Sequence, residues 1–437
     1  MEIDTEQHAE ERSWLYQPSF PEGWTHAPLY SLANWVNGLA FRDLQFSKSG
    51  MPVIKIAEIK GGITGQTKFT TQTFDEKVRV RSGDMLFSWS GQPETSIDVF
   101  RWDGPEGWLN QHVFRVTAKD EVLPEFLFYL LRYLKPSFIG IAKNKQTTGL
   151  GHVTKRDLER MIAAYPSKNE QREIAATLGA IDGRIDSLRR INATLEEMAR
   201  VLFQSWFVDF DPVHAKVAGQ KLVGLDDATS VLFPSNFDNK SDAVVPTGWR
   251  ATTLKDVIEI FDSKRIPLSG REREARKGTY PYHGAASVMD HVDDYLFDGI
   301  YVLMGEDGSV INVDGTAVLQ YVWGKFWVNN HAHVLRGKNS ISTEHLLLHL
   351  KSCNIAAFVN GAVQLKLNQG NLNRIPFMLP SPEIGEAFAK SIEPLFAKIR
   401  ANTDQSRTLA TLRDTLLPKL FNGELSVMQF AEEAEPA

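Results

Sequence analysis

Apolar side chains recur at steps of three, four and seven residues over the stretch 167–207. They are Ile174, Leu178, Ile181, Ile185, Leu188, Leu195, Leu202 and Trp206. This spacing places them on one face of an α-helix. Ser167 follows Pro166 directly and precedes Glu170 by three residues, which is a capping-box pattern and marks a helix start. The pattern predicts one amphipathic helix of about forty residues, roughly 60 Å long.

A second stretch near the end of the chain has the same pattern. Its apolar positions are Phe388, Ile392, Leu395, Ile399, Leu409, Leu412, Leu416 and Leu420, and the polar segment 402–407 interrupts them. Two long helices that each expose an apolar face bury those faces most readily against each other. We therefore expect an antiparallel pair with a globular domain at each end and a fixed distance between the domains.

The middle of the first helix permits two interpretations. Asn192 and Ala199 lie on the apolar face, and a buried Asn at such a position can fix the register of a helix pair at a cost in stability. Alternatively, the helix rotates there and buries Ile191 and Met198 instead.

Short runs of β-type residues occupy the rest of both halves of the chain. They fall at 78–80, 85–87, 114–116, 301–304 and 317–319, and glycine-rich or proline-containing turn signals separate them. Runs of this length with this punctuation predict a mixed domain of strands, loops and a few helices in each half.

The two halves also repeat each other in sequence. Pro21-Glu22-Gly23-Trp24 recurs as Pro246-Thr247-Gly248-Trp249, and Trp108-Leu-Asn-Gln-His112 recurs as Trp327-Val-Asn-Asn-His331. From Leu158 and Leu372 onward, a constant offset of 214 aligns about fifty residues without a gap. The repeat predicts an α+β fold in which two similar α/β domains are separated by two long antiparallel helices, with a pseudo-twofold relation between the halves.

Composition restricts the class of protein. The net charge of −6 argues mildly against a surface that is basic throughout, and the single cysteine, Cys353, excludes an internal disulfide and suits a reducing cytoplasm. The acidic N-terminus lacks the apolar core of a signal peptide. No stretch approaches the roughly 20 apolar residues of a membrane helix.

Catalytic and metal-binding motifs are missing from the sequence. The segment Gly61-Gly62-Ile-Thr-Gly65-Gln66-Thr67 resembles a phosphate-binding loop but lacks its lysine. His331 and His333 offer only two of the four ligands that zinc normally takes, so we interpret them as packing residues and expect no metal. Asp209 and Asp211 suit a turn at a helix end. We expect no catalytic residue in this chain.

Four segments resemble the specificity subunit of a Type I restriction–modification system, and the resemblance extends from about Pro21 to Leu425. Two are helical: NEQREIAATLGAIDGRIDSLRRINATLEEMARVLFQSWFVDFDPV at 169–213 and TLRDTLLPKLFNGEL at 411–425. The others are YPYHGAASVMDHVDDYLFDGIYVLMGEDGSV at 280–310 and GKFWVNNHAHVLR at 324–336.

The resemblance implies a non-catalytic DNA-recognition subunit. In such a subunit, each of two target-recognition domains reads one half of a bipartite, asymmetric DNA target. The helices set the spacer between the half-sites and dock two methyltransferase (modification) subunits, which bind S-adenosylmethionine and methylate adenine N6. Restriction–translocase subunits complete the enzyme. This chain contains no NPPY, NPPF or DPPY motif for the flipped adenine, so base flipping belongs to a partner.

The corresponding boundaries follow the repeat. We expect target-recognition domain 1 at 1–165, the first helical region at 166–211, a linker at 212–245, target-recognition domain 2 at 246–379, the second helical region at 380–425 and a tail at 426–437.

Two polar segments are candidate DNA contacts, because lysine and arginine suit phosphates and glutamine can pair with adenine. In the first half they are Lys143, Lys145, Gln146, Thr147 and Thr148; in the second half they are Lys264, Arg265, Arg271, Arg273, Arg276, Lys277, Tyr282 and His283. The glycine-flanked residues Gly62, Gly65 and Gln66 are further loop candidates. A solvated charged loop is the alternative for each segment.

The ends of both helices are rich in large apolar residues. Trp206, Phe207 and Phe210 end the first helix, and Leu420 and Phe421 end the second. These residues are candidate anchors for a methyltransferase subunit. The alternative is that they pack against the base of a neighbouring domain, as aromatic residues at helical spacing usually do.

Two other functions remain open at this point. One is a free-standing bipartite DNA-binding regulator, which would bind its target without partners. The other is a DNA-cleaving or DNA-modifying enzyme whose motifs have diverged.

Overall fold

The computed structural model describes residues 18–145, 149–238, 245–361 and 364–426. The chain forms two compact units. Unit 1 combines Met1–Asp186 with Ser406–Ala437, and unit 2 is Ser187–Gln405. We call the mixed part of unit 1, up to residue 165, the first domain, and residues 245–379 of unit 2 the second domain.

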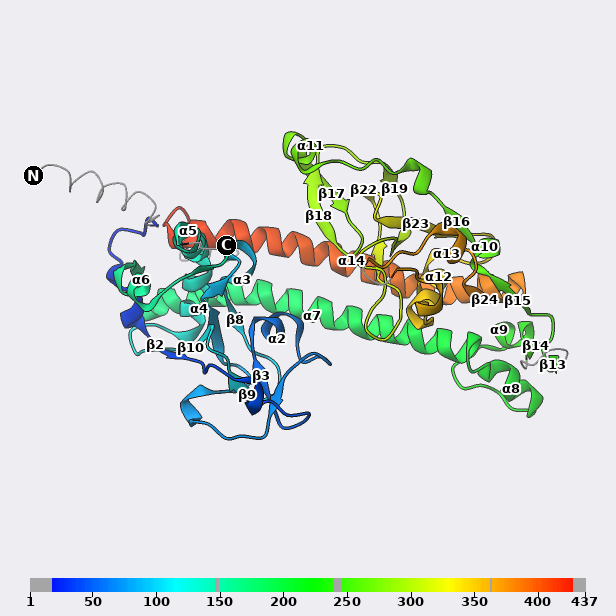
Figure 1. The fold of residues 1–437 in the computed structure, drawn as a ribbon, viewed down its shortest axis with the longest axis horizontal. Helices are drawn as coiled ribbons and strands as arrows, with labels where there is room; N and C mark the ends of the chain where they lie inside the picture. The colour runs from blue at the N-terminus through cyan, green and yellow to red at the C-terminus, as the bar shows by residue number, and fades with distance from the viewer. Residues whose placement is uncertain (1–17, 146–148, 239–244, 362–363, 427–437) are drawn as a thin grey trace, which may run out of the picture. The chain divides into compact units, whose positions relative to one another are not determined.

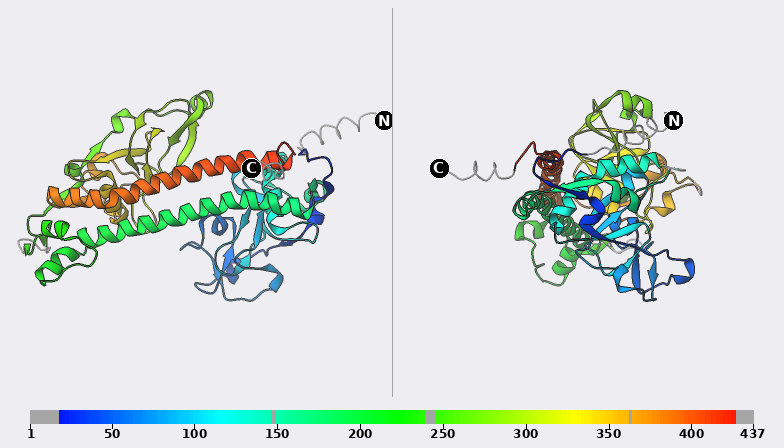
Figure 2. Two further views of the ribbon diagram at one scale, coloured as in Figure 1. Left: turned by 180° about the vertical axis from the view of Figure 1, so that it is seen from behind. Right: turned by 90° about the vertical axis from the view of Figure 1, so that its left-hand side faces the viewer.

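Both predicted long helices are present. α7 (Lys168–Phe207) and α14 (Pro382–Phe421) each contain 40 residues, and the offset of 214 relates their first residues and their last residues. Each is one unbroken helix (Figure 2). The amide N–H of Glu170 donates to Ser167 Oγ at 3.4 Å, so the predicted cap starts α7.

The two helices pair antiparallel within each unit. In unit 1, Arg413 donates to Asp182 at 2.7 Å, and Ile174 and Leu178 share a core with the end of α14. In unit 2, Asn192 donates to Thr403 at 3.0 Å, while Phe207 further along α7 contacts Phe388, with 4.7 Å between ring centroids. The partner's residue number falls as that of α7 rises, so the predicted antiparallel orientation is confirmed in both units.

Asn192 occupies the interface of the two helices. Its amide donates to the carbonyl oxygen of Ile399 at 3.2 Å and accepts from Asn402 at 2.8 Å. Ile191 and Met198 are 41% and 50% exposed. The interpretation with Asn192 on the helix interface is therefore confirmed, and the rotated helix is wrong, because the amide finds partners in the interface.

The first domain contains two sheets (Figure 1), and residues of both share one hydrophobic cluster. The larger has the strand order β2-β10-β6-β8 and the smaller has β4-β3-β9-β5. The strands of the larger sheet are β2 (Ala33–Asn37), β10 (Val113–Ala118), β6 (Met85–Ser88) and β8 (Asp98–Arg101). Those of the smaller sheet are β4 (Phe69–Thr70), β3 (Met51–Ile54), β9 (Gly107–Leu109) and β5 (Arg79–Val80).

Two strand pairs and short helices complete the first domain. β1 (Thr25–Pro28) pairs with β12 (Ile162–Tyr165), and β7 (Ser90–Gly91) pairs with β11 (Gly151–His152). The helices are η1 (Leu29–Leu32), η2 (Asp43–Gln45), α2 (Ile56–Gly61), η3 (Glu76–Val78), α3 (Pro93–Ser96), α4 (Pro124–Tyr133), α5 (Lys135–Asn144) and α6 (Lys155–Arg160).

The second domain repeats this topology. Its larger sheet has the order β16-β23-β20-β21, and its smaller sheet has the order β18-β17-β22-β19. The larger sheet contains β16 (Ile258–Ile260), β23 (Ala332–Gly337), β20 (Tyr301–Gly305) and β21 (Leu319–Val322). The smaller contains β18 (Val288–Val292), β17 (Lys277–His283), β22 (Lys325–Val328) and β19 (Phe297–Asp298). The predicted internal repeat is confirmed at the level of strand order.

The remaining elements of unit 2 are short. β15 (Arg250–Thr253) pairs with β24 (Pro376–Leu379), as β1 pairs with β12, and β13 (Phe237–Asp238) pairs with β14 (Val245–Pro246). The helices are α8 (Asp211–Val217), α9 (Asp227–Leu232), α10 (Leu254–Val257), η4 (Asp262–Lys264), α11 (Gly270–Ala275), α12 (Thr343–Ser352), η5 (Ala356–Phe358) and α13 (Gln369–Leu372). The strand predicted at 317–319 is misplaced, because β21 begins at Leu319 and Ala317 instead bridges Ile311.

The layers of each domain follow from alternation along the strands. In β6, Met85 and Phe87 face the core that holds α4, α5 and the long helices, whereas Leu86 faces the smaller sheet. In β20, Val302 and Met304 face α12 and the long helices, and Leu303 faces the smaller sheet. Strands buried on both faces read as continuous apolar runs, as these do.

Each long helix ends against the tryptophan of a Pro-x-Gly-Trp motif. Phe207 at the end of α7 lies 5.6 Å from Trp249, and Phe421 at the end of α14 lies 6.1 Å from Trp24, between ring centroids. Trp24 and Trp249 are the repeated residues of the two Pro-x-Gly-Trp motifs. In the described part of the chain, no helix is long and apolar enough to cross a lipid bilayer.

Candidate DNA interface

The two domains share the smaller sheet but differ in the segments around it. β3 runs parallel to β9 with Val53 opposite Trp108, and β17 runs parallel to β22 with Tyr282 opposite Trp327. In the first domain, α2 and a glycine-rich loop follow β3. In the second domain, α11 precedes β17, and only a short turn follows it. The same framework therefore presents different side chains in the two domains.

Most of the basic segment 263–278 is paired within the second domain. Arg273 lies 3.2 Å from Asp290 with its guanidinium over the ring of Tyr282. Lys277 donates to the same carboxylate at 2.9 Å. The hydrogen bond from Lys277, then those from the backbone of His291 and from Arg273, lower the pKa of Asp290 to about 2.

Two further arginines of this segment also have internal partners. Arg276 donates to Asp293 at 2.9 Å and lies over the ring of Trp327. The side chain of Arg265 is 11% exposed and donates to Glu306 at 2.6 Å. Arg265, Arg273 and Arg276 therefore hold the segment in place, and their predicted DNA contacts remain untested.

Lys264 and Arg271 differ from their neighbours. Both are exposed, and neither has a carboxylate partner among the described residues. Arg271 lies within α11 and Lys264 at the end of η4. These two cations of the predicted set are available for phosphate groups.

Tyr282 and His283 correct the sequence prediction. The side chain of Tyr282 is 1% exposed, and its hydroxyl accepts from the N–H of Leu268 at 2.9 Å. His283 is 6% exposed, with Nδ1 2.9 Å from the side-chain oxygen of Gln320. Because both side chains lie inside the domain, direct contact with a base is contradicted. They anchor the segments beside them.

The candidate residues of the first domain are partly paired. Lys143 lies 2.6 Å from Glu94, and Lys145 lies 2.5 Å from Asp157. Burial raises the pKa of Asp157, but hydrogen bonds from Lys145 and Thr154 outweigh it, so the pKa is lowered overall. Gln146, Thr147 and Thr148 lie outside the described residues.

The structure also identifies basic residues that the sequence reasoning missed. Lys48 and Lys68 flank β3 and β4, are exposed, and have no carboxylate partner in the ranges described. Between them, a Cβ added at Gly61, Gly62 or Gly65 would meet no atom within 4 Å, so this loop is open. The signal that would have found these lysines is the equivalence of β3 and β17, which places them around the same sheet as Arg271.

The candidate partner anchors are largely covered by this chain. Trp206 and Phe207 are 2% and 6% exposed, and Leu420 and Phe421 are 3% and 0% exposed. Of the five, only Phe210 is partly exposed. The packing alternative therefore describes four of the five residues, because the domain cores cover them. Contact of Phe210 with a partner stays a prediction.

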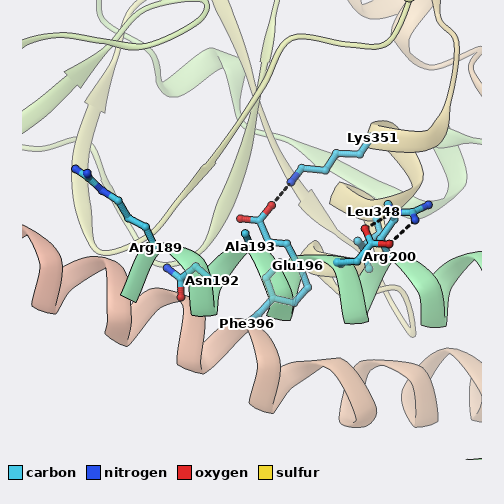
Figure 3. A pocket seen from close by; sticks show the side chains of 9 residues that line it. Arg189, Asn192, Ala193, Glu196, Arg200, Leu348, Lys351 and Phe396 are labelled. Atoms are coloured by element: carbon cyan, nitrogen blue, oxygen red, sulfur yellow. Dashed lines mark hydrogen bonds and ion pairs between the residues drawn. The ribbon is translucent and has the colours of Figure 1, made fainter. Parts of the chain in front are cut away.

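A pocket of about 430 Å³ lies beside α7 in unit 2 (Figure 3). Lys351 of α12 donates to Glu196 at 2.9 Å, and Arg200 donates to Glu197 at 2.6 Å. Asn192 at the other end belongs to the helix interface. Since these polar groups are occupied by one another, the pocket does not offer an arrangement for acid–base or nucleophilic chemistry.

One cluster in the described ranges has the composition of a metal site. Potential ligand atoms of Asp262, Glu306 and His333 all lie within 4.8 Å of one another. His331 is not a member and contacts Asp307 instead. Both ring nitrogens of His333 face protein oxygens, Asp262 Oδ2 at 2.6 Å and the Leu367 carbonyl at 2.7 Å, so neither is directed at a vacant ligand position.

The chain matches the family model of the Type I restriction modification DNA specificity domain twice, at residues 21–197 and 246–410. Because the two matches cover most of its length, the chain belongs to this family. It is similar to the HindI specificity subunit of Haemophilus influenzae, with 25% identity over 415 residues, 80% of this chain and 88% of the relative. It is also similar to the MjaIX specificity subunit of Methanocaldococcus jannaschii, with 27% identity over 73% of each chain.

Solved structures resemble the chain as well. The S subunit of a Type I restriction–modification system from M. genitalium aligns over 93% of this chain and 99% of its own length, with 18% identity and a TM-score of 0.48.

Proposed function

We propose that the chain is the DNA specificity subunit of a Type I restriction–modification enzyme, in which each domain reads one half of a bipartite, asymmetric target. The observation that carries this proposal is a repeated framework with unlike segments around the smaller sheet. Equivalent sheets place both reading surfaces on the same scaffold, and different side chains give the two half-sites different sequences. Family membership supports the same conclusion.

The cations that lack a carboxylate partner within the described residues would contact phosphates. In the first domain these include Lys48 and Lys68, and in the second domain Lys264 and Arg271. Phosphate contacts fix position and supply affinity, whereas contacts to base edges supply specificity. The open loop with Gln66, whose amide can pair with adenine, lies between the two lysines of the first domain.

The methyltransferase subunits would dock on the exposed apolar side of α7. Ile191, Met198 and Val201 are 41%, 50% and 52% exposed, and their spacing of seven and three residues places them on one side of the helix. An apolar stripe of this kind suits a stable interface with a partner subunit. S-adenosylmethionine would be bound by that partner, and restriction–translocase subunits would complete the assembly. A cytoplasmic location also stays a prediction.

A domain exchange tests the proposal. The chain is expressed with its methyltransferase subunits, and sequencing of N6-methyladenine gives the bipartite target. Replacement of residues 20–155 with those of a relative should change one half-site and leave the other intact. A change in both half-sites, or in neither, contradicts the assignment of one domain to each half.

The purified chain alone, incubated with DNA, Mg²⁺ and labelled S-adenosylmethionine, provides the control. We expect neither methyl transfer nor cleavage. Activity of the isolated chain would favour the alternative of a divergent DNA-modifying enzyme. Tight sequence-specific binding without partners would favour a free-standing regulator.

A further inference from the structure

Five side chains meet inside the second domain. Asp262 is the first residue of η4, His333 lies on β23 and Glu306 directly follows β20. Arg265 directly follows η4, and Gln369 is the first residue of α13. His333 is 0% exposed and its Nδ1 lies 2.6 Å from Asp262 Oδ2. Gln369 donates to that same oxygen at 2.6 Å, and Arg265 donates to Glu306 at 2.6 Å.

Hydrogen-bond geometry defines the charge of His333. Nε2 lies 2.7 Å from the carbonyl oxygen of Leu367, which can only accept. Burial raises the pKa of Asp262, but its hydrogen bonds with His333, the N–H of Val334 and the amide of Gln369 outweigh it and lower the pKa overall. An ionised Asp262 also only accepts. Both ring nitrogens of His333 therefore donate, which requires an imidazolium.

The cluster is then electrically balanced. The carboxylates of Asp262 and Glu306 face the cations of His333 and Arg265. A metal ion would need an unprotonated Nδ1 on His333, and it would lie beside the Arg265 guanidinium. The observed contacts favour a closed ionic network over a metal site. Networks of this kind are costly to break, because removal of one member leaves a buried charge unpaired.

Three segments of the second domain are tied together at this cluster. Arg265 begins the chain that leads to α11 and also donates to the carbonyl of Ala332 at 2.6 Å. Glu306 joins the loop after β20, where its carbonyl accepts from the N–H of Leu367 at 2.8 Å. Gln369 is the first residue of α13. The ionic contacts thus set where the candidate DNA segment 263–278 leaves the sheet.

The first domain carries a different set at the same positions. Phe114 lies opposite Asn37 and Phe87, just as His333 lies opposite Met304 on the equivalent strand. The backbone N–H of Trp89 donates to the carbonyl of His112, and the carbonyl of Trp89 accepts from the N–H of Val153. Glu306 makes the same two backbone bonds, to His331 and Leu367. The equivalents of Asp262, Glu306 and His333 are therefore Asn37, Trp89 and Phe114.

The first-domain set is held by an amide and aromatic rings. The ring N–H of Trp89 donates to Asn37 at 3.0 Å, and the rings of Trp89 and Phe114 lie 5.9 Å apart. One framework is therefore fixed by two unrelated chemistries at a position next to the reading segments.

We propose that the cluster of Asp262, Arg265, Glu306 and His333 positions the DNA-reading segments of the second domain, so that His333 controls recognition of one half-site only. The inference rests on the proposed function. His333 is a positioning residue, because its side chain is 0% exposed and acts through Asp262 and the Leu367 backbone.

The test uses the chain assembled with its methyltransferase subunits and His333→Phe, which introduces the residue of the equivalent first-domain position. Methylation is measured on oligonucleotides that carry single mismatches in either half-site. We expect discrimination against mismatches in the second half-site to fall about tenfold, within the range that one lost base contact costs. Discrimination in the first half-site should not change. Unchanged discrimination at both half-sites would overturn the inference.

Two variants separate positioning from stability. Val322→Ala removes buried apolar volume between the two sheets of the same domain but removes no bond of the ionic cluster, and we expect it to lower the melting temperature but keep the discrimination. The double variant His333→Phe/Asp262→Asn removes the orphaned carboxylate, so its melting temperature should recover while discrimination stays low. If the double variant recovers both, or Val322→Ala loses discrimination as well, the cluster has no positioning role.

A spectroscopic measurement tests the charge on the full chain. With ¹⁵N-labelled histidine, one imidazole should show two protonated nitrogens, and His333→Phe should remove that signal. An unprotonated ring nitrogen on His333 would contradict the ionic network.

If His333→Phe does not fold, Arg265→Lys provides a second test, because it keeps the charge but loses bonds to Asp262 and Ala332. We expect a smaller fall in discrimination against mismatches in the second half-site. Unchanged discrimination there would overturn the inference.

The outcomes also separate the inference from the proposed function. A wild-type complex that methylates no bipartite site contradicts the proposed function. A wild-type complex with a bipartite target and a folded His333→Phe variant that reads both half-sites normally contradicts only the positioning role.

Discussion

The amides of the half-buried Asn192 and the buried Asn402 determine how α7 and α14 meet in unit 2. Asn402 is 1% exposed and donates to Asn192 at 2.8 Å. Asn192 in turn donates to Ile399 and Thr403 of the facing helix. A polar pair inside an apolar interface disfavours other registers, because any shift leaves the amides without partners.

Asn192→Ala should lower the free energy of unfolding by about 1–3 kcal/mol, because it removes the hydrogen bonds of Asn192 to Ile399, Thr403 and Asn402 across the helix interface. Ile191→Ala is the matched control, since this neighbouring side chain is exposed and should change stability by less than about 0.5 kcal/mol. Chemical denaturation of the two variants measures both effects. A larger loss for Ile191→Ala would mean that the helix presents a different face in solution.

His345 makes unit 2 sensitive to acid. Its ring lies 4.4 Å from Phe207 and 5.0 Å from Phe388, between centroids. Burial, and then the nearby His349, lower the pKa of His345 from 6.5 to about 3. Below pH 6.5 the unfolded chain therefore binds a proton that the folded chain does not.

Stability should consequently fall as the pH drops from about 6.5 towards 3, with a limiting slope of about 1.4 kcal/mol per pH unit for this group. His345→Leu keeps an apolar side chain in the aromatic cluster and should flatten the dependence. Melting temperatures of both proteins between pH 4 and 7 provide the measurement. Parallel curves would show that other groups control the acid response.

At the scale of single elements, most arginines in and directly after α11 are paired with carboxylates of the second domain. β18 and the turn after it supply Asp290 and Asp293, which pair with Arg273 and Arg276. Arg271 lies in the same helix with no carboxylate partner in the described ranges. Arg271 and Arg273 can therefore be compared within one helix, since the first is an exposed cation and the second is paired with Asp290.

Arg271→Ala should weaken DNA binding by the assembled complex and reduce the slope of log K against log salt by about 0.9, because one phosphate contact is lost. Arg273→Ala should instead lower the melting temperature, because it removes a pair with Asp290 and a contact over Tyr282. Fluorescence anisotropy at several salt concentrations distinguishes them. If only Arg273→Ala reduced the slope of log K against log salt, Arg273 and not Arg271 would be the residue that contacts phosphate.

The long helices and the repeat could be predicted from local spacing, because Ser167, the apolar steps and the offset of 214 are all features of neighbouring residues. The candidate site could be predicted only in part. In the sequence, no local pattern marks Arg273 and Arg276 as paired. Their partners Asp290 and Asp293 lie 17 residues further along the chain and reach them only through the β17–β18 pairing. Burial of Tyr282 depends on the same pairing. Lys48 and Lys68 carry no local signal until β3 is matched to β17.

At the scale of the whole chain, the two 40-residue helices are its longest continuous elements. Insertion of seven residues preserves the apolar repeat of a helix pair and lengthens each helix by about 10 Å. If the helices set the spacer, insertion of a heptad in both should lengthen the non-specific spacer of the methylation target by about 3 bp, from the 3.4 Å rise of DNA per base pair. Sequencing of N6-methyladenine measures the spacer. An unchanged spacer would refute this role of the helices.

The first domain begins where α14 ends. A Cβ added at Gly423 would lie 3.0 Å from Cγ of Pro21, and Phe421 packs against Trp24 and Tyr133. The start of the first domain and the end of α14 thus lie next to each other in unit 1, so a short linker can join them. A circular permutant that joins Leu425 to Phe20 through a short linker and begins within the segment 212–245 should fold with a melting curve close to that of the original chain.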